Sequence, residues 1–329
     1  MTSIVIDPYT LAYPTEKDTT KFEDYIDRIL DIKKISKINN FKLFVSRETS
    51  KILFKENNYP NWDILKNTLI EIGLSEFIQP RDIMSTIEGL LKLAVIEEFV
   101  GIEEVLYEKL IYDQSFLDGR GESYKDELEK LFILILLNLN LEGNKNLLAS
   151  IKDTSFDVEG RLLEVESSGD VLITLPDEIK GEITSFSNME GLLTGLDPVE
   201  LWRNSHTIEE YKNSLNIYIF QRTGDFPANQ EWIFGDVFFE KARNSGHLHE
   251  IPKIKSLLKS LSETILGENL PSRHALRTGE GGNNPQVTRG RDKAWRRDID
   301  YEYHMHYWQD RHKIEFASLG VHNDMRIPG

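Results

Sequence analysis

The chain has 329 residues, of which 40% are hydrophobic and 29% charged, a composition typical of folded globular proteins. The absence of cysteine excludes disulfide bonds, cysteine–zinc sites and thiol catalysis, and favours a reducing compartment such as the cytoplasm. Residues 1–270 hold 47 acids against 29 lysines and arginines, whereas residues 271–329 hold eight acids against ten lysines and arginines. We therefore expect any contact with a polyanion near the C-terminus.

Residues 1–118 are predicted to form an α/β domain. Apolar runs that favour strands alternate with segments of helical spacing; the strands are expected at 3–12, 41–46 and 76–80, and the helices at 20–35, 48–57, 61–74 and 82–99. Alternation of this kind favours a parallel sheet. The polar, glycine-containing stretch 116–127 is predicted to contain the domain boundary.

Residues 119–245 are expected to form a mixed middle region. A helix is predicted over 125–140, and its apolar run is too short to span a bilayer, so we expect it to be buried and the protein to have no membrane contact. A β-hairpin follows over 155–176 with its turn at 167–170, and then two further helical stretches at 198–220 and 235–244. The N-terminus lacks the features of a signal peptide, so a cytoplasmic location is expected.

Residues 246–329 are predicted to form a helix plus an antiparallel sheet, which makes the whole chain a multi-domain α+β protein. An amphipathic helix at 251–266 precedes a glycine- and asparagine-rich loop, and two strands joined by a tight turn close the chain. Side chains alternate along a strand. In the segment 293–308 the predicted core face therefore carries Ile299, Tyr301, Tyr303, Met305 and Tyr307, and the other face carries Asp298, Asp300, Glu302, His304, His306 and Trp308.

This closing segment resembles a known family. The YoeB branch of the RelE family, ribosome-dependent mRNA endoribonuclease toxins, ends in the pattern Trp-Ser-Arg-Arg-Ile-x-x-Glu-His-Arg-Leu-Val-Tyr. Aligned without a gap, the residues of this chain that coincide with the pattern are Trp295, Arg297, Ile299, Glu302 and Tyr307. The catalytic histidine of the family falls on His322. The resemblance covers roughly the last 75 residues and implies a RelE-like domain over 246–329.

The departures from the family pattern affect its chemistry. The general-base glutamate of the family corresponds to His274, its transition-state arginine to His304, and its terminal tyrosine to Asn323. The resemblance implies RNA cleavage without a metal or other cofactor, with RNA as partner and a possible association with the ribosome.

Metal-independent RNA cleavage needs a base for the 2′-hydroxyl proton, a cation for the charged transition state and an acid for the leaving oxygen. His274 or His304 is expected to be the base, His322 the acid, and Arg296 or Arg297 the phosphate clamp. Glu302 is expected to orient a histidine or an arginine. The predicted RNA contacts are Arg277, Arg289, Arg291, Lys293, Trp295, His306, Tyr307 and Trp308. The same charges are also typical of ion pairs on a solvated strand face.

Metal sites provide an alternative hypothesis. His304 and His306 share a predicted strand face, where Glu302, His322 or Asp324 would complete a ligand shell, and His247-x-His249 forms a second pair. At the N-terminus, a strand-end Asp7 and a helical Glu48 resemble the opening of PIN-domain nucleases. With Asp82 they would hold Mg²⁺ or Mn²⁺. The same acids are equally typical of turns and helix starts.

Three functional hypotheses follow. The first is a toxin-like, metal-independent endoribonuclease with a large acidic regulatory body, in bacterial stress response or phage defence. The second is a metal-dependent nuclease, and the third is a non-catalytic scaffold subunit of a defence or toxin–antitoxin assembly. Residues 1–270 are expected to bind a protein partner or to act as a built-in antitoxin, because their acidic excess disfavours naked nucleic acid.

Overall fold

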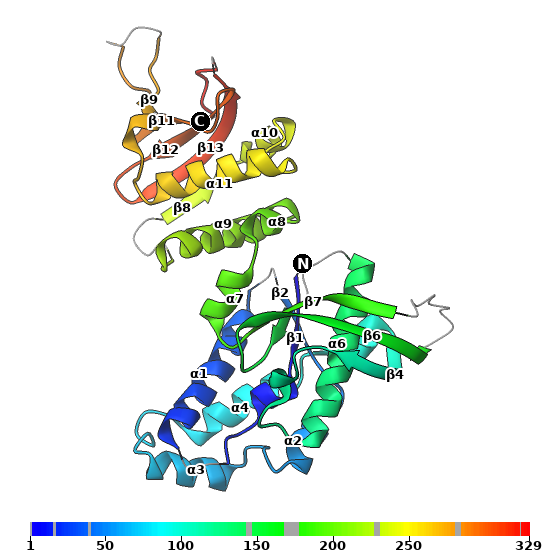
Figure 1. The fold of residues 1–329 in the computed structure, drawn as a ribbon. Helices are drawn as coiled ribbons and strands as arrows, with labels where there is room; N and C mark the ends of the chain where they lie inside the picture. The colour runs from blue at the N-terminus through cyan, green and yellow to red at the C-terminus, as the bar shows by residue number, and fades with distance from the viewer. Residues whose placement is uncertain are drawn as a thin grey trace. The chain divides into compact units, whose positions relative to one another are not determined.

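The computed structural model describes residues 2–15, 18–38, 41–142, 147–167, 178–226, 231–279, 284–322 and 324–329. The chain divides into two compact units, Met1–Gly195 and Leu196–Gly329. Each unit has its own sheet with helices around it (Figure 1), which confirms the multi-domain α+β class. The division differs from the boundaries predicted at 118 and 245, because strands from the first two predicted regions join a single sheet.

The sheet of the first unit has the strand order β3-β2-β1-β5-β7-β6-β4. Its strands are β1 (Thr2–Ile6), β2 (Phe41–Val45), β3 (Ala94–Val95), β4 (Ile102–Ile111), β5 (Leu147–Ala149), β6 (Thr154–Ser167) and β7 (Glu178–Phe186). Neighbouring strands from β3 to β7 are parallel. The alternation of elements predicted this for β1 and β2, whereas β5 and β7 lie outside the predicted α/β domain. The β7–β6 and β6–β4 pairs are antiparallel, and β4 was not predicted.

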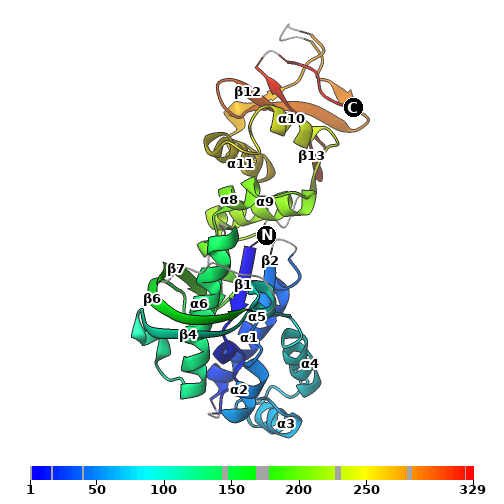
Figure 2. The same ribbon diagram turned by 90° about the vertical axis from the view of Figure 1, so that its right-hand side faces the viewer.

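The helices of the first unit cover this sheet. They are α1 (Thr19–Ile35), α2 (Thr49–Lys55), α3 (Trp62–Glu71), α4 (Pro80–Leu90), α5 (Ile96–Val100), α6 (Glu122–Glu142) and α7 (Met189–Gly195), with the short 3-10 helices η1 (Pro8–Leu11) and η2 (Gln114–Leu117). α6 lies beside β4, β6 and β7 (Figure 2). Its apolar part packs in one core with these strands, so its predicted burial is confirmed. Within the described ranges, no helix has the length and apolar character needed to cross a membrane.

Two predicted elements of the first unit are wrong. Residues 76–80 form a turn and the start of α4 rather than a strand, and Phe77 is 81% exposed. The helix predicted over 82–99 is divided into α4 and α5 by β3, which pairs with β2 and so supplies the third parallel strand. Of the predicted hairpin, the turn beyond Ser167 and the second strand at 171–176 lie outside the described residues; β6 pairs with β7.

The second unit packs helices on one face of an antiparallel sheet. The helices are α8 (Pro198–Arg203), α9 (Ile208–Thr223), α10 (Phe238–Asn244) and α11 (Ile251–Ile265), with η3 (Leu270–Ser272). The strands are β8 (Glu231–Phe234), β9 (Arg273–Ala275), β10 (Thr288–Arg289), β11 (Asp292–Asp298), β12 (Tyr303–Gln309) and β13 (Lys313–Val321). The order is β10-β11-β12-β13-β8, with β9 also paired to β11 and β8 parallel to β13. The predicted helix plus antiparallel sheet is therefore present.

The segment 293–308 is a hairpin rather than a single strand. β11 ends at Asp298 and β12 begins at Tyr303, and Oδ1 of Asp300 in the turn accepts hydrogen bonds from the backbone N–H groups of Glu302 and Tyr303, both at 2.8 Å. Tyr301 is consequently 91% exposed and does not reach the core. Met305 and Tyr307 do pack against the helices, as the alternation predicted.

Candidate functional site

The hairpin brings most of the predicted catalytic residues to one face of the sheet. Cross-strand pairing sets His274 opposite Arg296, Arg296 opposite His306, and Asp298 opposite His304. Directly paired residues project from the same face of a sheet. This face is opposite to the one that packs against α11, because the intervening residues of β12 and β13 belong to the helix-side core.

Four side chains on this face form a continuous chain of contacts, here called the histidine cluster. His274 Nε2 lies 3.9 Å from Asp298 Oδ2, and Asp298 Oδ1 lies 2.7 Å from His304 Nδ1. The rings of His304 and His322 are 4.2 Å apart between centroids and tilted by 33°. In addition, His304 Nε2 lies 3.1 Å from the backbone carbonyl oxygen of His322. The cluster therefore consists of His274, Asp298, His304 and His322.

The cluster has a buried centre and accessible ends. His304 is 1% exposed, whereas His274 and His322 both reach solvent. A carbonyl oxygen is only an acceptor, so His304 Nε2 carries a hydrogen and donates it to His322. Burial lowers the pKa of His304, and the Asp298 carboxylate acts in the opposite direction. Solvent-accessible imidazoles thus flank an inner histidine that is fixed by its neighbours.

The C-terminal residues cover the adjoining part of this face. Trp308 Nε1 donates to the carbonyl oxygen of Pro328 at 2.8 Å, and Ile327 packs on the same small core as Trp308. His306 is 0% exposed, so its imidazole is enclosed by the protein. Burial lowers the pKa of His306 to about 4, so its ring is neutral at physiological pH.

Three predicted RNA contacts are contradicted by burial. The side chains of His306, Tyr307 and Trp308 are all enclosed, Tyr307 on the helix side and the other two beneath the C-terminal residues. A base cannot stack on an aromatic ring that the protein itself covers. These residues stabilise the unit instead.

The two adjacent arginines have different environments. Arg297 is 1% exposed; its Nη1 lies 2.9 Å from Glu263 Oε2, and its Nη2 donates to the carbonyl oxygen of Glu268 at 2.7 Å. It therefore joins β11 to the end of α11 and is not available as a phosphate clamp. Arg296 lies on the face of the histidine cluster, where its Nη1 is 3.3 Å from Met325 Sδ.

Glu302 lies in the exposed turn, and the structure assigns it a backbone role. Its carbonyl oxygen accepts a hydrogen bond from the backbone N–H of His322 at 2.9 Å, which fixes the end of β13. The carboxylate that contacts the histidines is that of Asp298. Sequence analysis did not select Asp298 because it did not predict the turn that places Asp298 opposite His304.

The predicted basic contacts fall into two groups. The first group has partners within the protein. Arg289 Nη2 is paired with Asp292 at 3.0 Å and with Glu315 at 2.6 Å, so nearby carboxylates compensate its charge. Arg277 is exposed and donates to a backbone carbonyl oxygen in its own loop. Arg291, Lys293 and Trp295 instead line one pocket, together with residues that sequence analysis did not select.

The structure does not assemble the predicted histidine metal sites. His247 is buried, with Nδ1 2.9 Å from Ser245 Oγ and Nε2 3.7 Å from Asp300 Oδ2, whereas His249 is exposed. Over the described ranges, no group of three or more histidine, aspartate or glutamate residues has an arrangement that could hold a metal ion.

The carboxylates of the PIN-like hypothesis are also separated. Asp7 is fully buried, ion-paired with Arg120 Nη1 at 2.7 Å, and accepts a hydrogen bond from Ser150 Oγ at 2.8 Å. A guanidinium thus compensates the charge that a metal ion would otherwise balance. Asp82 is exposed in the first turn of α4. Glu48 lines a pocket to which neither Asp7 nor Asp82 contributes. The Mg²⁺ or Mn²⁺ site expected from these three acids is not formed.

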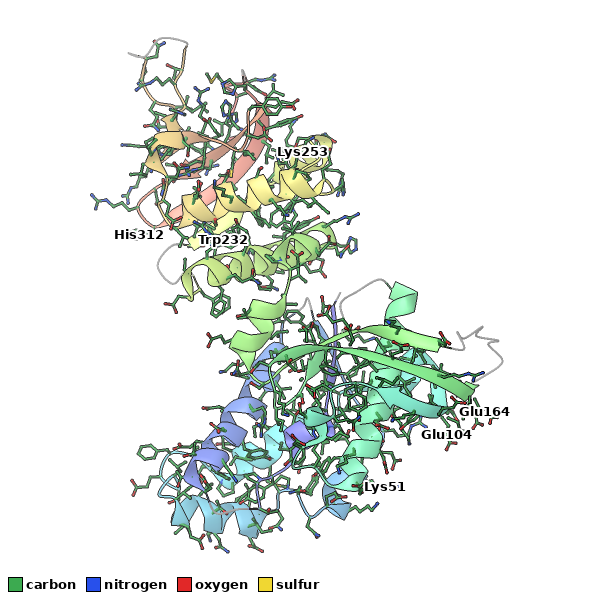
Figure 3. All side chains as sticks on the ribbon, viewed as in Figure 1. Lys51, Glu104, Glu164, Trp232, Lys253 and His312 are labelled. Atoms are coloured by element: carbon green, nitrogen blue, oxygen red, sulfur yellow. The ribbon has the colours of Figure 1, made fainter. Side chains whose placement is uncertain are left out.

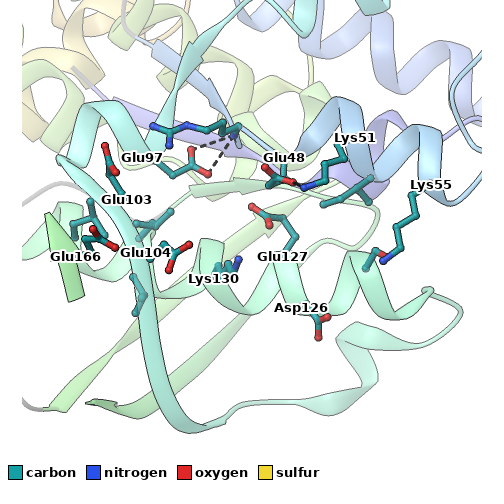
Figure 4. A pocket seen from close by; sticks show the side chains of 16 residues that line it. Glu48, Lys51, Lys55, Glu97, Glu103, Glu104, Asp126, Glu127, Lys130 and Glu166 are labelled. Carbon is teal, nitrogen blue, oxygen red and sulfur yellow. Dashed lines mark hydrogen bonds and ion pairs between the residues drawn. The ribbon is translucent and has the colours of Figure 1, made fainter. Parts of the chain in front are cut away.

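The pocket that contains Glu48 is an acidic cavity of about 460 Å³ in the first unit (Figure 4). Ser46 Oγ contacts the carboxylates of both Glu97 and Glu127, and burial raises the pKa of Glu127. Lys51 pairs with Glu48 at 2.6 Å. Glu48, Glu97 and Glu127 thus have internal partners, which favours a structural role for these three carboxylates.

Comparison with known proteins provides no identification. The chain matches no protein-family model, no curated protein and no solved structure.

Proposed function

We propose that the second unit cleaves RNA by metal-independent acid–base catalysis at the histidine cluster. The observation that supports this proposal is the pair of accessible imidazoles, His274 and His322, on either side of the buried Asp298–His304 contact. Histidine accepts and donates protons near neutral pH, and RNA cleavage requires one group of each kind.

Each cluster residue has a definite task in this mechanism. His274 removes the proton of the 2′-hydroxyl, and the 2′-oxygen attacks the adjacent phosphorus. As the bond from phosphorus to the 5′-oxygen breaks, His322 donates a proton to that oxygen. The products are a 2′,3′-cyclic phosphate and a 5′-hydroxyl end. Arg296, on the same face, compensates the charge that develops on the phosphate oxygens.

The inner pair positions the outer histidines. The Asp298 carboxylate, 3.9 Å from His274 Nε2, orients the imidazole of His274. His304 holds His322 by ring contact and by its hydrogen bond to the carbonyl oxygen of that residue. His304 is therefore a positioning residue, and it does not contact RNA.

The same proposal gives the acidic part of the chain a regulatory task. Residues 1–270 hold 47 acids against 29 cations, which disfavours contact with naked RNA and suits binding of a protein partner or a built-in antitoxin role. A toxin-like effector of bacterial stress response or phage defence combines these properties.

The test is RNA degradation by the full-length protein, assayed on free single-stranded RNA and on ribosome-bound mRNA, with and without EDTA. We expect cleavage that persists in EDTA and falls by about 100-fold or more in His274→Ala and in His322→Ala, since general acid–base catalysis contributes on this scale. His249→Ala, an exposed histidine outside the cluster, is the matched control and should retain activity. Loss of cleavage on chelation, or unchanged cleavage in both cluster variants, would refute the proposal.

A further inference from the structure

A basic pocket of about 790 Å³ lies at one end of the sheet in the second unit. Its cations come from three separate segments: Arg273 from β9, Arg291 and Lys293 from the turn before β11 and its first residues, and Arg311 from the turn after β12. Figure 3 labels His312, which lines the pocket beside Arg311. Topology, rather than sequence proximity, therefore assembles this concentration of positive charge.

The charge of the pocket is only slightly compensated. Its lining residues include four lysines and arginines but a single carboxylate, that of Asp310, in a chain whose net charge is −16. Asp310 already accepts hydrogen bonds from the backbone N–H groups of His312 and Lys313, at 2.7 and 2.8 Å. Within the described ranges, Arg291, Lys293 and Arg311 form no ion pair, and all three are exposed.

Arg273 is held in place before any ligand arrives. Its guanidinium carbon lies 3.5 Å from the centroid of the Trp295 ring, and its Nη2 donates to Gln309 Oε1 at 2.7 Å. Its Nε is buried and has no hydrogen-bond partner in the part of the chain that the structure describes. A fixed guanidinium loses little freedom on binding, which favours recognition of an anion. Because Arg273 covers the Trp295 ring, a base would stack on the guanidinium rather than on the indole.

We propose that this basic pocket binds a small ligand of the nucleoside polyphosphate class. Its volume lies within the range of small-molecule sites, and its arginines match the forked geometry of phosphate. Single-stranded nucleic acid is bound instead by grooves whose cations follow the backbone, whereas these cations converge on one concavity. The pocket is also separate from the histidine cluster, because Trp295 lies on the α11 side of β11 and Arg296 on the other. The proposal therefore does not depend on RNA cleavage.

The test is isothermal titration of the full-length protein with ATP, inorganic triphosphate and adenosine at low ionic strength. We expect ATP and triphosphate to bind and adenosine not to bind. Arg291→Ala, Lys293→Ala and Arg311→Ala should each weaken ATP binding by about tenfold, because each removes one charged contact to phosphate. Lys255→Ala is the matched control, since it removes an exposed cation of α11 outside the pocket and should leave ATP affinity unchanged. The melting temperature of each variant confirms that it is folded.

Three results would overturn the proposal. The first is the absence of ATP and triphosphate binding to the wild-type protein. The second is equal weakening by Lys255→Ala, which would show non-specific attraction. The third is tighter binding of a single-stranded oligonucleotide than of ATP with the same dependence on Arg291, Lys293 and Arg311, which would assign the pocket to a nucleic acid strand.

Discussion

Replacement of Arg297 by alanine tests whether this residue is structural or functional. Sequence analysis expected Arg296 or Arg297 to be a phosphate clamp, but the structure buries the Arg297 guanidinium against Glu263 and the carbonyl oxygen of Glu268. The substitution leaves the Glu263 carboxylate, 10% exposed, without its main cationic partner. We therefore expect Arg297→Ala to destabilise the second unit.

The magnitude follows from the contacts that are lost and kept. Breaking a buried ion pair by removing one partner costs about 3–5 kcal/mol. Glu263 keeps a hydrogen bond from Asn269 Nδ2 at 3.0 Å, so we expect the lower end, about 3 kcal/mol. Adding Glu263→Gln to Arg297→Ala should recover part of this loss, because no uncompensated charge then remains.

The assay is denaturant unfolding of the full chain followed by tryptophan fluorescence. Four of the five tryptophans, Trp202, Trp232, Trp295 and Trp308, belong to the second unit, so the signal reports mainly on that unit. Arg296→Ala is the matched control: a neighbouring arginine of the same strand that is not buried, for which we expect a loss below about 1 kcal/mol. Equal stability of the two variants, or a loss below about 1 kcal/mol in Arg297→Ala, would refute the structural assignment.

Three other predictions concern burial and charge. The pKa of His306 is about 4 in the folded protein and about 6.5 in an unfolded chain. As the pH falls, the unfolded state therefore binds a proton at a higher pH than the folded state does. The free energy of unfolding should therefore fall by up to about 3 kcal/mol as pH drops from about 6.5 to 4. His306→Gln should lack this contribution, so the difference between the wild-type and variant curves of unfolding free energy against pH should show it. Arg120→Ala should destabilise the first unit by about 3–5 kcal/mol, because it leaves the buried Asp7 carboxylate without its cationic partner. Addition of Mg²⁺ or Mn²⁺ should leave the melting temperature of the wild-type protein unchanged. A metal-induced increase in that temperature would restore the PIN-like hypothesis. Trp308→Phe should cost about 1 kcal/mol and speed amide exchange in residues 324–329, because the hydrogen bond to Pro328 is lost; unchanged exchange would show that this bond does not hold the C-terminal residues.

Local periodicity was sufficient to predict much of the fold. The alternation of strands and helices predicted the parallel pairing of β1 and β2, and the period of two placed Met305 and Tyr307 in the core. β4 was missed because register shifts in its pairing with β6 interrupt the alternation of buried and exposed residues. The turn after Asp298 was missed because the residues around Tyr301 continue the apolar–polar alternation of a strand, while the Asp300 side chain closes the turn.

The site could be predicted only in part, because its remaining contacts join distant residues. The resemblance selected His274, His304 and His322, and the sheet does place all three on one face. The sequence does not reveal that Arg297 meets Glu263, 34 residues earlier, or that strand pairing brings Arg273 and Arg311 to one pocket. Both depend on tertiary packing, which local spacing does not encode.

The most direct test of the central claim is the chemistry of the RNA ends produced in EDTA. A single-stranded RNA substrate should be cleaved to 2′,3′-cyclic phosphate and 5′-hydroxyl ends, and the fully 2′-deoxy substrate of the same sequence should remain intact, because the 2′-oxygen is the nucleophile. His322→Ala should form neither product at the wild-type rate. Cleavage of the 2′-deoxy substrate, or 5′-phosphate ends that require a divalent metal, would contradict the account.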